Sequence, residues 1–187
     1  MNAIKQAFNI DLKLPKQLFK EEFNKYYYNN ELLPDNHYIF FSVLYDFMIK
    51  TGEYIIYFYS KRWLDQKYYS FEFNINQHTH ESIFETLMFK HENSLLEFFT
   101  FSEIVFITTE NNSLNIVFDR DTEWLIFQPA EQNETVFKSL YLNNEVFENF
   151  RHKTHRTMYE GNVAFRHAFH KNPLYIKELK QNYRIDY

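Results

Sequence analysis

The sequence has 187 residues, of which 45% are hydrophobic and 24% charged, with a formal net charge of −5. This balance is typical of a globular protein, so one domain over residues 1–187 is expected. The chain holds only two widely separated glycines, Gly52 and Gly161, and no cysteine. Glycine-rich phosphate loops, dinucleotide fingerprints, disulfide frameworks and thiolate metal sites are thereby excluded.

The N-terminal region predicts neither export nor membrane insertion. It has no uninterrupted apolar stretch of signal-peptide length, and charges follow at Asp11, Lys13 and Lys16. The longest wholly apolar run, residues 54–59, is far shorter than the roughly 20 residues that cross a bilayer. We therefore expect a cytoplasmic protein with no membrane partner.

The first half of the chain predicts two helices and then a hairpin. Apolar residues at helical spacing indicate a helix over about 15–28, and a second helix is expected between Pro34 and Gly52. Residues 53–60 are rich in β-branched and aromatic side chains, and residues 68–75 alternate between aromatic and polar ones. These patterns are typical of two neighbouring strands.

The second half predicts a meander followed by helices. A helical pattern begins at Thr79, and three short apolar segments then follow, separated by polar turns. The expected strands are 103–109, 114–119 and 123–128, and the later helices lie near 134–153, 157–170 and 173–183.

The fold class that follows is α+β. We expect an antiparallel sheet of about five strands, made of the meander 103–128 and the hairpin 53–75, with helices packed on one face. The residues expected in the core include Leu18, Phe41, Leu44, Leu87 and Phe165.

Charge is distributed unevenly along the chain. Residues 81–150 carry a net charge of −10, whereas residues 151–184 carry +6. If these segments do not interleave, the molecule has one acidic and one basic side. Alternatively, the two segments pack side by side and neutralise each other.

Two groups of residues have metal-like spacing, but neither predicts a metal site. The pairs His152 with His155 and His167 with His170 stand at i, i+3, without the glutamate of the metalloprotease pattern. Asp119, Asp121 and Glu123 alternate across a turn, but the central glycine of a calcium loop is missing. No cofactor is expected, and no serine, histidine and acid set indicates a nucleophile.

Two triplets suggest an enzyme alternative. His80-Glu81-Ser82 and His152-Lys153-Thr154 resemble the paired motifs of the two-histidine phosphoesterases. The resemblance implies that His80 and His152 act as general acid and base, while Ser82 and Thr154 hold the phosphoryl oxygens. In that family each triplet lies on a strand between apolar residues, whereas here His80 begins a helical pattern.

The meander carries a second resemblance. A small acidic, cysteine-free α+β domain, in which Phe106-Ile-Thr-Thr leads to Leu114-Asn-Ile-Val-Phe-Asp and Trp124-Leu-Ile-Phe, resembles bacterial immunity proteins of contact-dependent inhibition and related interbacterial toxin systems. The resemblance covers about residues 92–150. It implies a non-enzymatic cytoplasmic protein that binds one cognate toxin and blocks it.

The acidic segment supports this interpretation physically. A toxin that acts on nucleic acid presents a basic surface to phosphates, and an acidic inhibitor competes for that surface and associates rapidly with it. The expected partner-binding residues lie in or near the polar loops of the meander: Glu110, Asp119, Asp121, Glu123, Glu131 and Glu134.

A third hypothesis makes the basic C-terminal stretch a polyanion surface. The basic residues there are Arg151, Lys153, Arg156, Arg166, Lys171, Lys177, Lys180 and Arg184. The whole chain is acidic, with a pI near 5.9, whereas nucleic-acid-binding domains usually have a basic balance. Nucleic acid is therefore not the expected partner.

Overall fold

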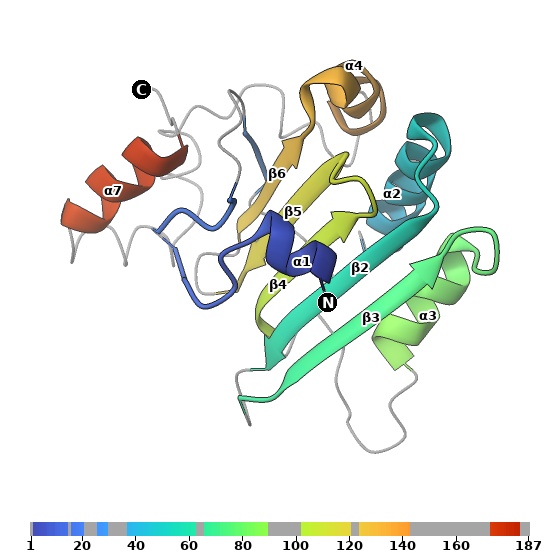
Figure 1. The fold of residues 1–187 in the computed structure, drawn as a ribbon, viewed down its shortest axis with the longest axis horizontal. Helices are drawn as coiled ribbons and strands as arrows, with labels where there is room; N and C mark the ends of the chain where they lie inside the picture. The colour runs from blue at the N-terminus through green and yellow to red at the C-terminus, as the bar shows by residue number, and fades with distance from the viewer. Residues whose placement is uncertain are drawn as a thin grey trace.

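A six-stranded antiparallel sheet forms the centre of the molecule (Figure 1). The computed structural model describes residues 2–14, 16–20, 26–29, 37–62, 66–89, 102–120, 124–142 and 173–183. Their strands are β1 (Tyr27–Asn29), β2 (Ile55–Arg62), β3 (Tyr68–Asn74), β4 (Ser102–Thr109), β5 (Leu114–Asp119) and β6 (Trp124–Pro129). The spatial order is β1-β6-β5-β4-β2-β3, so β1 and β3 are the edges of the described sheet.

The helices lie on both sides of this sheet. They are α1 (Asn2–Ala7), α2 (His37–Thr51), α3 (His80–Phe89), α4 (Glu134–Phe137) and α7 (Pro173–Tyr183), with a π-helical turn at Lys138–Leu142 after α4. In Figure 1, α1 lies in front of the sheet, whereas α2 and α3 lie behind it. Among the described residues, no helix combines the length and apolar character needed to cross a membrane.

The antiparallel sheet and the α+β class are confirmed. Strands β4, β5 and β6 pair in sequence order, with Phe106 opposite Val117 and Val117 opposite Ile126. Strands β2 and β3 form the expected hairpin, and β2 also pairs with β4, with Phe58 opposite Ile107. The hairpin therefore extends the meander into one continuous sheet.

The connection between α2 and β2 requires a glycine at position 52. Gly52 has a φ of +72°, a left-handed conformation that residues with a Cβ rarely adopt. The next amide, that of Glu53, donates a hydrogen bond of 2.9 Å to the carbonyl of Met48. This is the helix-ending geometry that glycine favours, and it directs the chain into the sheet.

Two hydrophobic cores lie on opposite faces of the sheet. The first joins α2, α3 and α4 to the strands through Phe41, Phe58 and Phe127. The second joins α1 and α7 to the other face through Phe8, Phe106 and Leu179. Side chains that are neighbours along a strand point to opposite faces, so alternate strand residues enter alternate cores.

The expectation that helices cover only one face is therefore wrong. The predicted core positions themselves are confirmed, since Leu18, Phe41, Leu44 and Leu87 are all buried. However, Leu18 belongs to the core under α1, and the other three belong to the core under α2 and α3. Phe165 lies outside the described residues.

The predicted helix over 15–28 is also wrong where the structure describes that segment. Residues 16–20 are not helical, and Phe19 forms an antiparallel bridge with Phe8. Tyr27–Asn29 forms β1 and pairs with β6. The backbone groups of this segment find partners in neighbouring segments, which replaces the hydrogen bonding that a helix would supply.

The later helices match the sequence prediction in part. The helix expected near 134–153 is described as α4 and the π-helical turn, which end at Leu142. The helix expected at 173–183 has the bounds of α7, whereas 157–170 lies outside the described residues.

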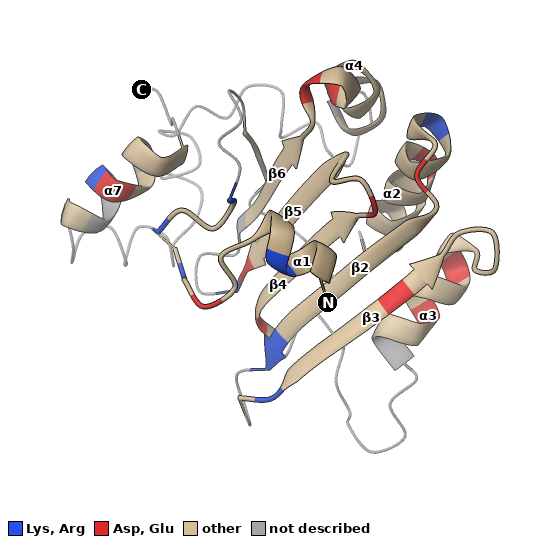
Figure 2. Ribbon diagram, in the orientation of Figure 1, with Lys and Arg blue, Asp and Glu red and all other residues tan. Residues whose placement is uncertain are grey.

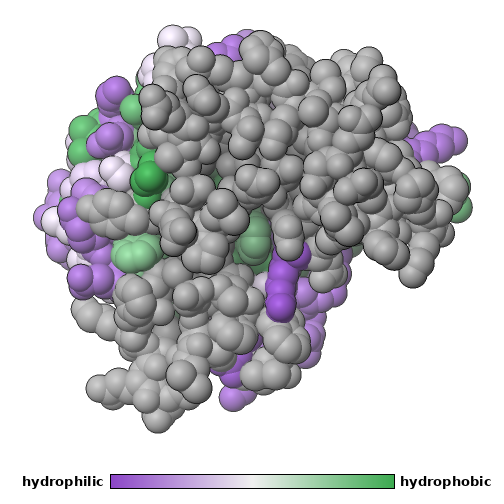
Figure 3. Space-filling view, turned by 180° about the vertical axis from the view of Figure 1, so that it is seen from behind, coloured by the Kyte–Doolittle hydropathy of each residue, from purple (hydrophilic) through white to green (hydrophobic). Residues whose placement is uncertain are grey.

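Seen from behind (Figure 3), the visible described residues are a mixture of hydrophilic and hydrophobic side chains.

Candidate functional site

The acidic residues expected to bind a partner are divided between the two ends of the sheet (Figure 2). Glu110 lies in the β4–β5 turn, and Glu131 follows β6, which is the same end because Leu114 pairs with Pro129. Asp119 ends β5 at the opposite end, roughly 17 Å away along the strand. Asp121 and Glu123 lie outside the described residues, so the structure places Glu110 and Glu131 at one end of the sheet and Asp119 at the other.

Asp119 does not lie in an exposed loop, contrary to the sequence prediction. Its side chain is only 6% exposed. Strand alternation places it on the same face as Val117, which is buried in the core under α1. The strand has its predicted bounds, but its last side chain is buried, and Asp119 is therefore removed from the candidate surface.

Glu134 is engaged within the fold. Its carboxylate accepts a hydrogen bond of 2.5 Å from the Tyr27 hydroxyl and lies 2.6 Å from the Lys138 ammonium. Burial, this hydrogen bond and the carboxylate charge all raise the pKa of Tyr27. Glu134 therefore ties α4 to β1, and among the predicted acidic residues Glu110 and Glu131 remain exposed.

Some acidic and basic side chains neutralise each other. Glu103, from the acidic segment, forms ion pairs with Lys13 and Lys61, the latter at 3.6 Å. In α7, Glu178 lies 2.7 Å from Lys16. Figure 2 shows basic and acidic residues interspersed along the described elements. Of the basic C-terminal residues, Lys177 and Lys180 lie in α7, and the other six lie outside the described residues.

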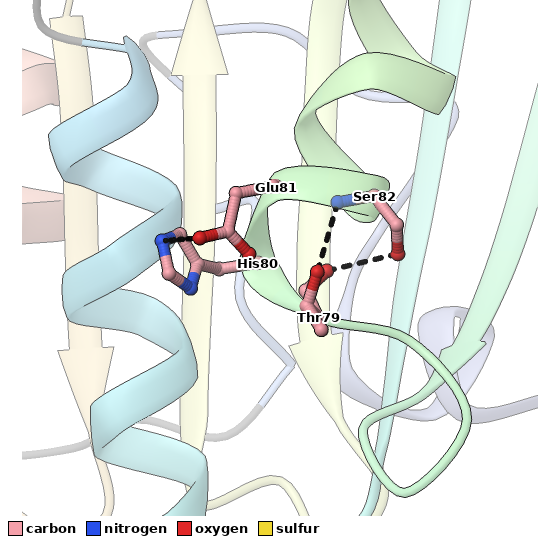
Figure 4. Close-up of polar contacts among 4 residues, drawn as sticks. All are labelled: Thr79, His80, Glu81 and Ser82. Carbon is pink, nitrogen blue, oxygen red and sulfur yellow. Dashed lines mark hydrogen bonds and ion pairs between the residues drawn. The ribbon is translucent and has the colours of Figure 1, made fainter.

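His80 and Ser82 are placed at the start of α3 (Figure 4). Ser82 donates a hydrogen bond of 3.0 Å from its hydroxyl to the Thr79 carbonyl, and its amide donates one of 3.3 Å to the Thr79 hydroxyl. His80 lies 3.1 Å from Glu81 and is directed toward α2, with its ring 5.8 Å from that of Tyr45. The Thr79 hydroxyl thus caps α3, and the Ser82 hydroxyl is bonded to the carbonyl of the same residue.

The remaining histidine predictions fall elsewhere. His152, Thr154, His155, His167 and His170 lie outside the described residues. Across the ranges that the structure describes, no three His, Asp or Glu side chains gather in an arrangement suited to a metal ion.

A surface that the sequence analysis did not single out lies on the β2–β3 hairpin. Tyr57 and Tyr59 of β2 share a sheet face with Tyr68 and Glu72 of β3, because Tyr57 pairs with Glu72 and Tyr68 pairs with Lys61. We call these three tyrosines, together with Ser70 and Glu72, the tyrosine face. In Figure 1 it is the front of the hairpin, where β3 extends beyond α1.

The opposite face of the hairpin holds it rigidly in the fold. Phe73 packs edge-on against Phe58 at 5.8 Å, and Phe58 packs against Phe41 of α2 at 5.9 Å. Phe71 stacks beside Phe73. The tyrosine face is therefore presented on a strand pair whose position is fixed from behind, which limits the entropy lost on binding.

The tyrosine face is partly open to solvent and carries negative charge. Tyr68 is 52% exposed, and Ser70 and Glu72 are exposed. Burial raises the pKa of Tyr57, and the nearby charges of Glu72 and Glu110 raise it further. Tyr57 thus lies near enough to two carboxylates, one on the hairpin and one on the β4–β5 turn, for their charge to act on its hydroxyl.

The outer side of β3 completes this surface. β3 has seven residues and pairs with β2 alone among the described strands. Its sequence, Tyr-Tyr-Ser-Phe-Glu-Phe-Asn, contains no proline, lysine or glycine, and its register with β2 is regular. Natural edge strands commonly carry such residues or bulges to prevent pairing with another chain, so β3 is suited to accept a strand.

The alternation of tyrosines at 57 and 59 was the sequence signal for this surface. It was not decisive, because strand period alone does not tell which of two faces is covered by helices.

A scan of protein-family models, a search of characterised proteins and a search of solved structures each gave no match to this chain.

Proposed function

We propose that this protein is a non-enzymatic inhibitor, of the immunity-protein kind, which binds a cognate toxin through the tyrosine face and the edge of β3 that no other described strand covers. The observation that carries the proposal is the seven-residue edge strand without proline, lysine or a bulge, which carries the exposed Tyr68 and Glu72 side chains. Backbone pairing along such an edge supplies affinity, and the side chains beside it supply specificity.

The composition of the tyrosine face supports a protein partner. Tyrosines supply large contact area for a small loss of conformational entropy and are enriched in protein interfaces. Their polar hydroxyls tolerate solvent before the partner arrives. The rigid hairpin therefore needs little rearrangement to bind.

The charge around this face supports a basic partner. Glu72 and Glu110 flank Tyr57, so positively charged residues on the partner would be attracted to this region. Enzymes that act on nucleic acid present such residues. The proposed partner is thus a toxin with a basic surface, of the nuclease class, and the contribution of acidic residues is centred on Glu72 and Glu110.

The first test is protection. Co-expression with the product of a neighbouring toxin gene should preserve cell growth, and the two purified proteins should form a stable complex in gel filtration. Failure of the wild-type chain to protect and to bind the products of the adjacent genes would contradict the proposed function.

The second test locates the surface. Glu72→Lys with Glu110→Lys should reduce the association rate constant by about tenfold at low salt and weaken its salt dependence. The matched control is Glu85→Lys, which changes the same type of charge on α3. Equal association rates for the double variant and the control, measured by surface plasmon resonance, would remove this face from the interface.

A further inference from the structure

A pocket of about 580 Å³ lies between the N-terminal segment and the start of β3. This volume is in the range of sites that hold small organic molecules. Its walls include Lys5, Asp11 and Lys20 from the N-terminal segment and Tyr59 and Tyr68 from the hairpin. The pocket does not include Glu72 or Glu110, but it shares Tyr59 and Tyr68 with the tyrosine face.

The N-terminal wall of the pocket is held by backbone hydrogen bonds. The Asn9 amide donates to the Leu18 carbonyl at 2.7 Å, and the Lys20 amide donates to the Ala7 carbonyl at 2.8 Å. Between them, Phe8 and Phe19 pack at 5.4 Å. These contacts hold Lys5 and Lys20 on the same side of the pocket without relying on loop flexibility.

Two lysines and one tyrosine among the lining residues can donate hydrogen bonds to a ligand in this pocket. The Lys20 ammonium donates to the main-chain carbonyl of Lys5, which fixes its position and leaves two N–H groups for a ligand. Tyr59 is only 6% exposed and lines the pocket. Within the described part of the chain, no protein group forms a hydrogen bond with its hydroxyl.

The Tyr59 hydroxyl is a proton donor under ordinary conditions. Burial raises its pKa, and the proximity of Tyr68 and Asp11 raises it further. A neutral phenol in a pocket that Lys5 and Lys20 also line is suited to an anionic acceptor. Since two lysines can neutralise a double charge and bind phosphate as point charges, the donor set favours phosphate over a single carboxylate.

The apolar part of the lining favours a planar ring. Tyr59 and Tyr68 stack with ring centroids 5.6 Å apart and planes inclined by 22°, and Tyr68 remains 52% exposed. Its open surface can receive an aromatic ring, and Phe8 supplies apolar contact deeper in the pocket. Asp11 adds an acceptor, which hydroxyl or amino groups of the same ligand can satisfy.

We propose that this pocket binds a nucleoside monophosphate, with the phosphate against Lys5, Lys20 and the Tyr59 hydroxyl and the base against Tyr68. Asp11 accepts a hydrogen bond from the sugar or the base. Each chemical part of the ligand thus has a matching group of residues. The lysines bind the charged phosphate, Tyr68 contacts the base, and the Asp11 carboxylate accepts a hydrogen bond from a hydroxyl or amino group. The proposal does not depend on the toxin-binding function.

The test is a titration of the full-length protein with adenosine 5′-monophosphate. Binding is measured by isothermal titration calorimetry and, separately, by changes in the tyrosine signals of NMR spectra. A dissociation constant at or below about 1 mM is expected. Tyr59→Phe should weaken binding about fivefold and Lys20→Gln about tenfold, since each removes one hydrogen bond or charge to the phosphate. Adenosine and inorganic phosphate, each alone, should bind more weakly than the nucleotide.

Two matched variants serve as controls. Tyr54→Phe removes the hydroxyl of an exposed tyrosine just before β2, and Lys50→Gln removes a charge at the end of α2, but neither residue lines the pocket. Both should bind as the wild type does, and thermal unfolding should confirm that every variant is folded. Absence of nucleotide binding at about 1 mM, or equal binding by Tyr59→Phe, Lys20→Gln and the controls, would overturn the proposal. Inorganic phosphate binding as tightly as the nucleotide would overturn the role of the ring.

Discussion

At the residue scale, Glu53 shows how a buried carboxylate can fix a turn. It is 1% exposed, and its oxygens accept hydrogen bonds from the Asn111 amide at 3.1 Å, the Asn111 side chain at 3.3 Å and the Ser113 hydroxyl. These three donors belong to the β4–β5 turn. Glu53 therefore holds the turn that carries Glu110 against the beginning of β2.

Replacing this carboxylate should destabilise the protein. Glu53→Ala removes the acceptor from three donors and is expected to lower the free energy of unfolding by about 3 kcal/mol. Glu53→Gln retains one acceptor oxygen and should lower it by less. Urea denaturation measures both values, with exposed Glu131→Ala as the control expected to change stability by under about 0.5 kcal/mol. Equal stability of Glu53→Ala and the control would contradict this role.

The acidic residues show why the candidate site was only partly predictable. Their sequence positions correctly placed Glu110 and Glu131 on the surface. Asp119 was misplaced because a carboxylate at the end of a strand can point either to solvent or into a core, and the sequence does not show what covers that core. Glu53 was not singled out because its partners are nearly 60 residues away in the chain.

At the scale of elements, α7 completes the second core through one tyrosine. The Tyr183 hydroxyl accepts a hydrogen bond of 3.0 Å from the Leu18 amide and donates one of 2.7 Å to the Lys16 carbonyl. Its ring packs edge-on with Tyr26 at 5.4 Å. The extended segment 16–20 thereby receives from α7 the hydrogen bonds that a helix would have supplied internally.

Removing this hydroxyl should loosen the N-terminal segment. Tyr183→Phe leaves a buried amide and carbonyl without these partners, and the free energy of unfolding should fall by about 2 kcal/mol. The Leu18 amide should exchange its hydrogen much faster, as measured by NMR. Tyr54→Phe alters an exposed tyrosine and should change neither quantity; unchanged Leu18 exchange in Tyr183→Phe would show that the bond is unimportant.

Most strands were predictable because period-two patterns and polar turns are local. The helix over 15–28 was wrongly predicted because Leu18 and Phe19 can enter a core equally well from an extended chain. The backbone groups of such a chain can form hydrogen bonds with a neighbouring helix instead of within a helix of their own. The sequence does contain an indication that both faces of the sheet are covered. Residues 104–107 form a continuous apolar run, and such a run indicates burial on both faces.

At the scale of the whole molecule, burial of tyrosines determines the response to alkaline pH. Burial raises the pKa of Tyr27, Tyr57, Tyr59 and Tyr141 in the folded protein, with neighbouring negative or tyrosine groups adding to the first three. In the unfolded chain these groups ionise near pH 10. Their contribution to stability is therefore complete below about pH 10 and is lost as the pH rises above it.

Thermal unfolding should reveal this loss. The melting temperature is expected to fall steeply between about pH 10 and 12. Tyr27→Phe removes one of the titrating groups, so its melting temperature should fall less over that interval, although it starts lower for want of the Glu134 hydrogen bond. Tyr54→Phe removes the hydroxyl of an exposed tyrosine, and its melting temperature should change with pH as that of the wild type does. Parallel curves for all three proteins would contradict the assignment.

The contact between Tyr183 and residues 16–18 also sets an order of events during synthesis. The strands and α2 can assemble one core as soon as residue 142 is available, because every described element in that core precedes it. The core under α1 needs Leu179 and Tyr183. On the ribosome, the N-terminal segment must therefore wait with Phe8, Leu18 and Phe19 incompletely covered until α7 has emerged, which makes that interval the one in which a chaperone or a protease would meet this chain.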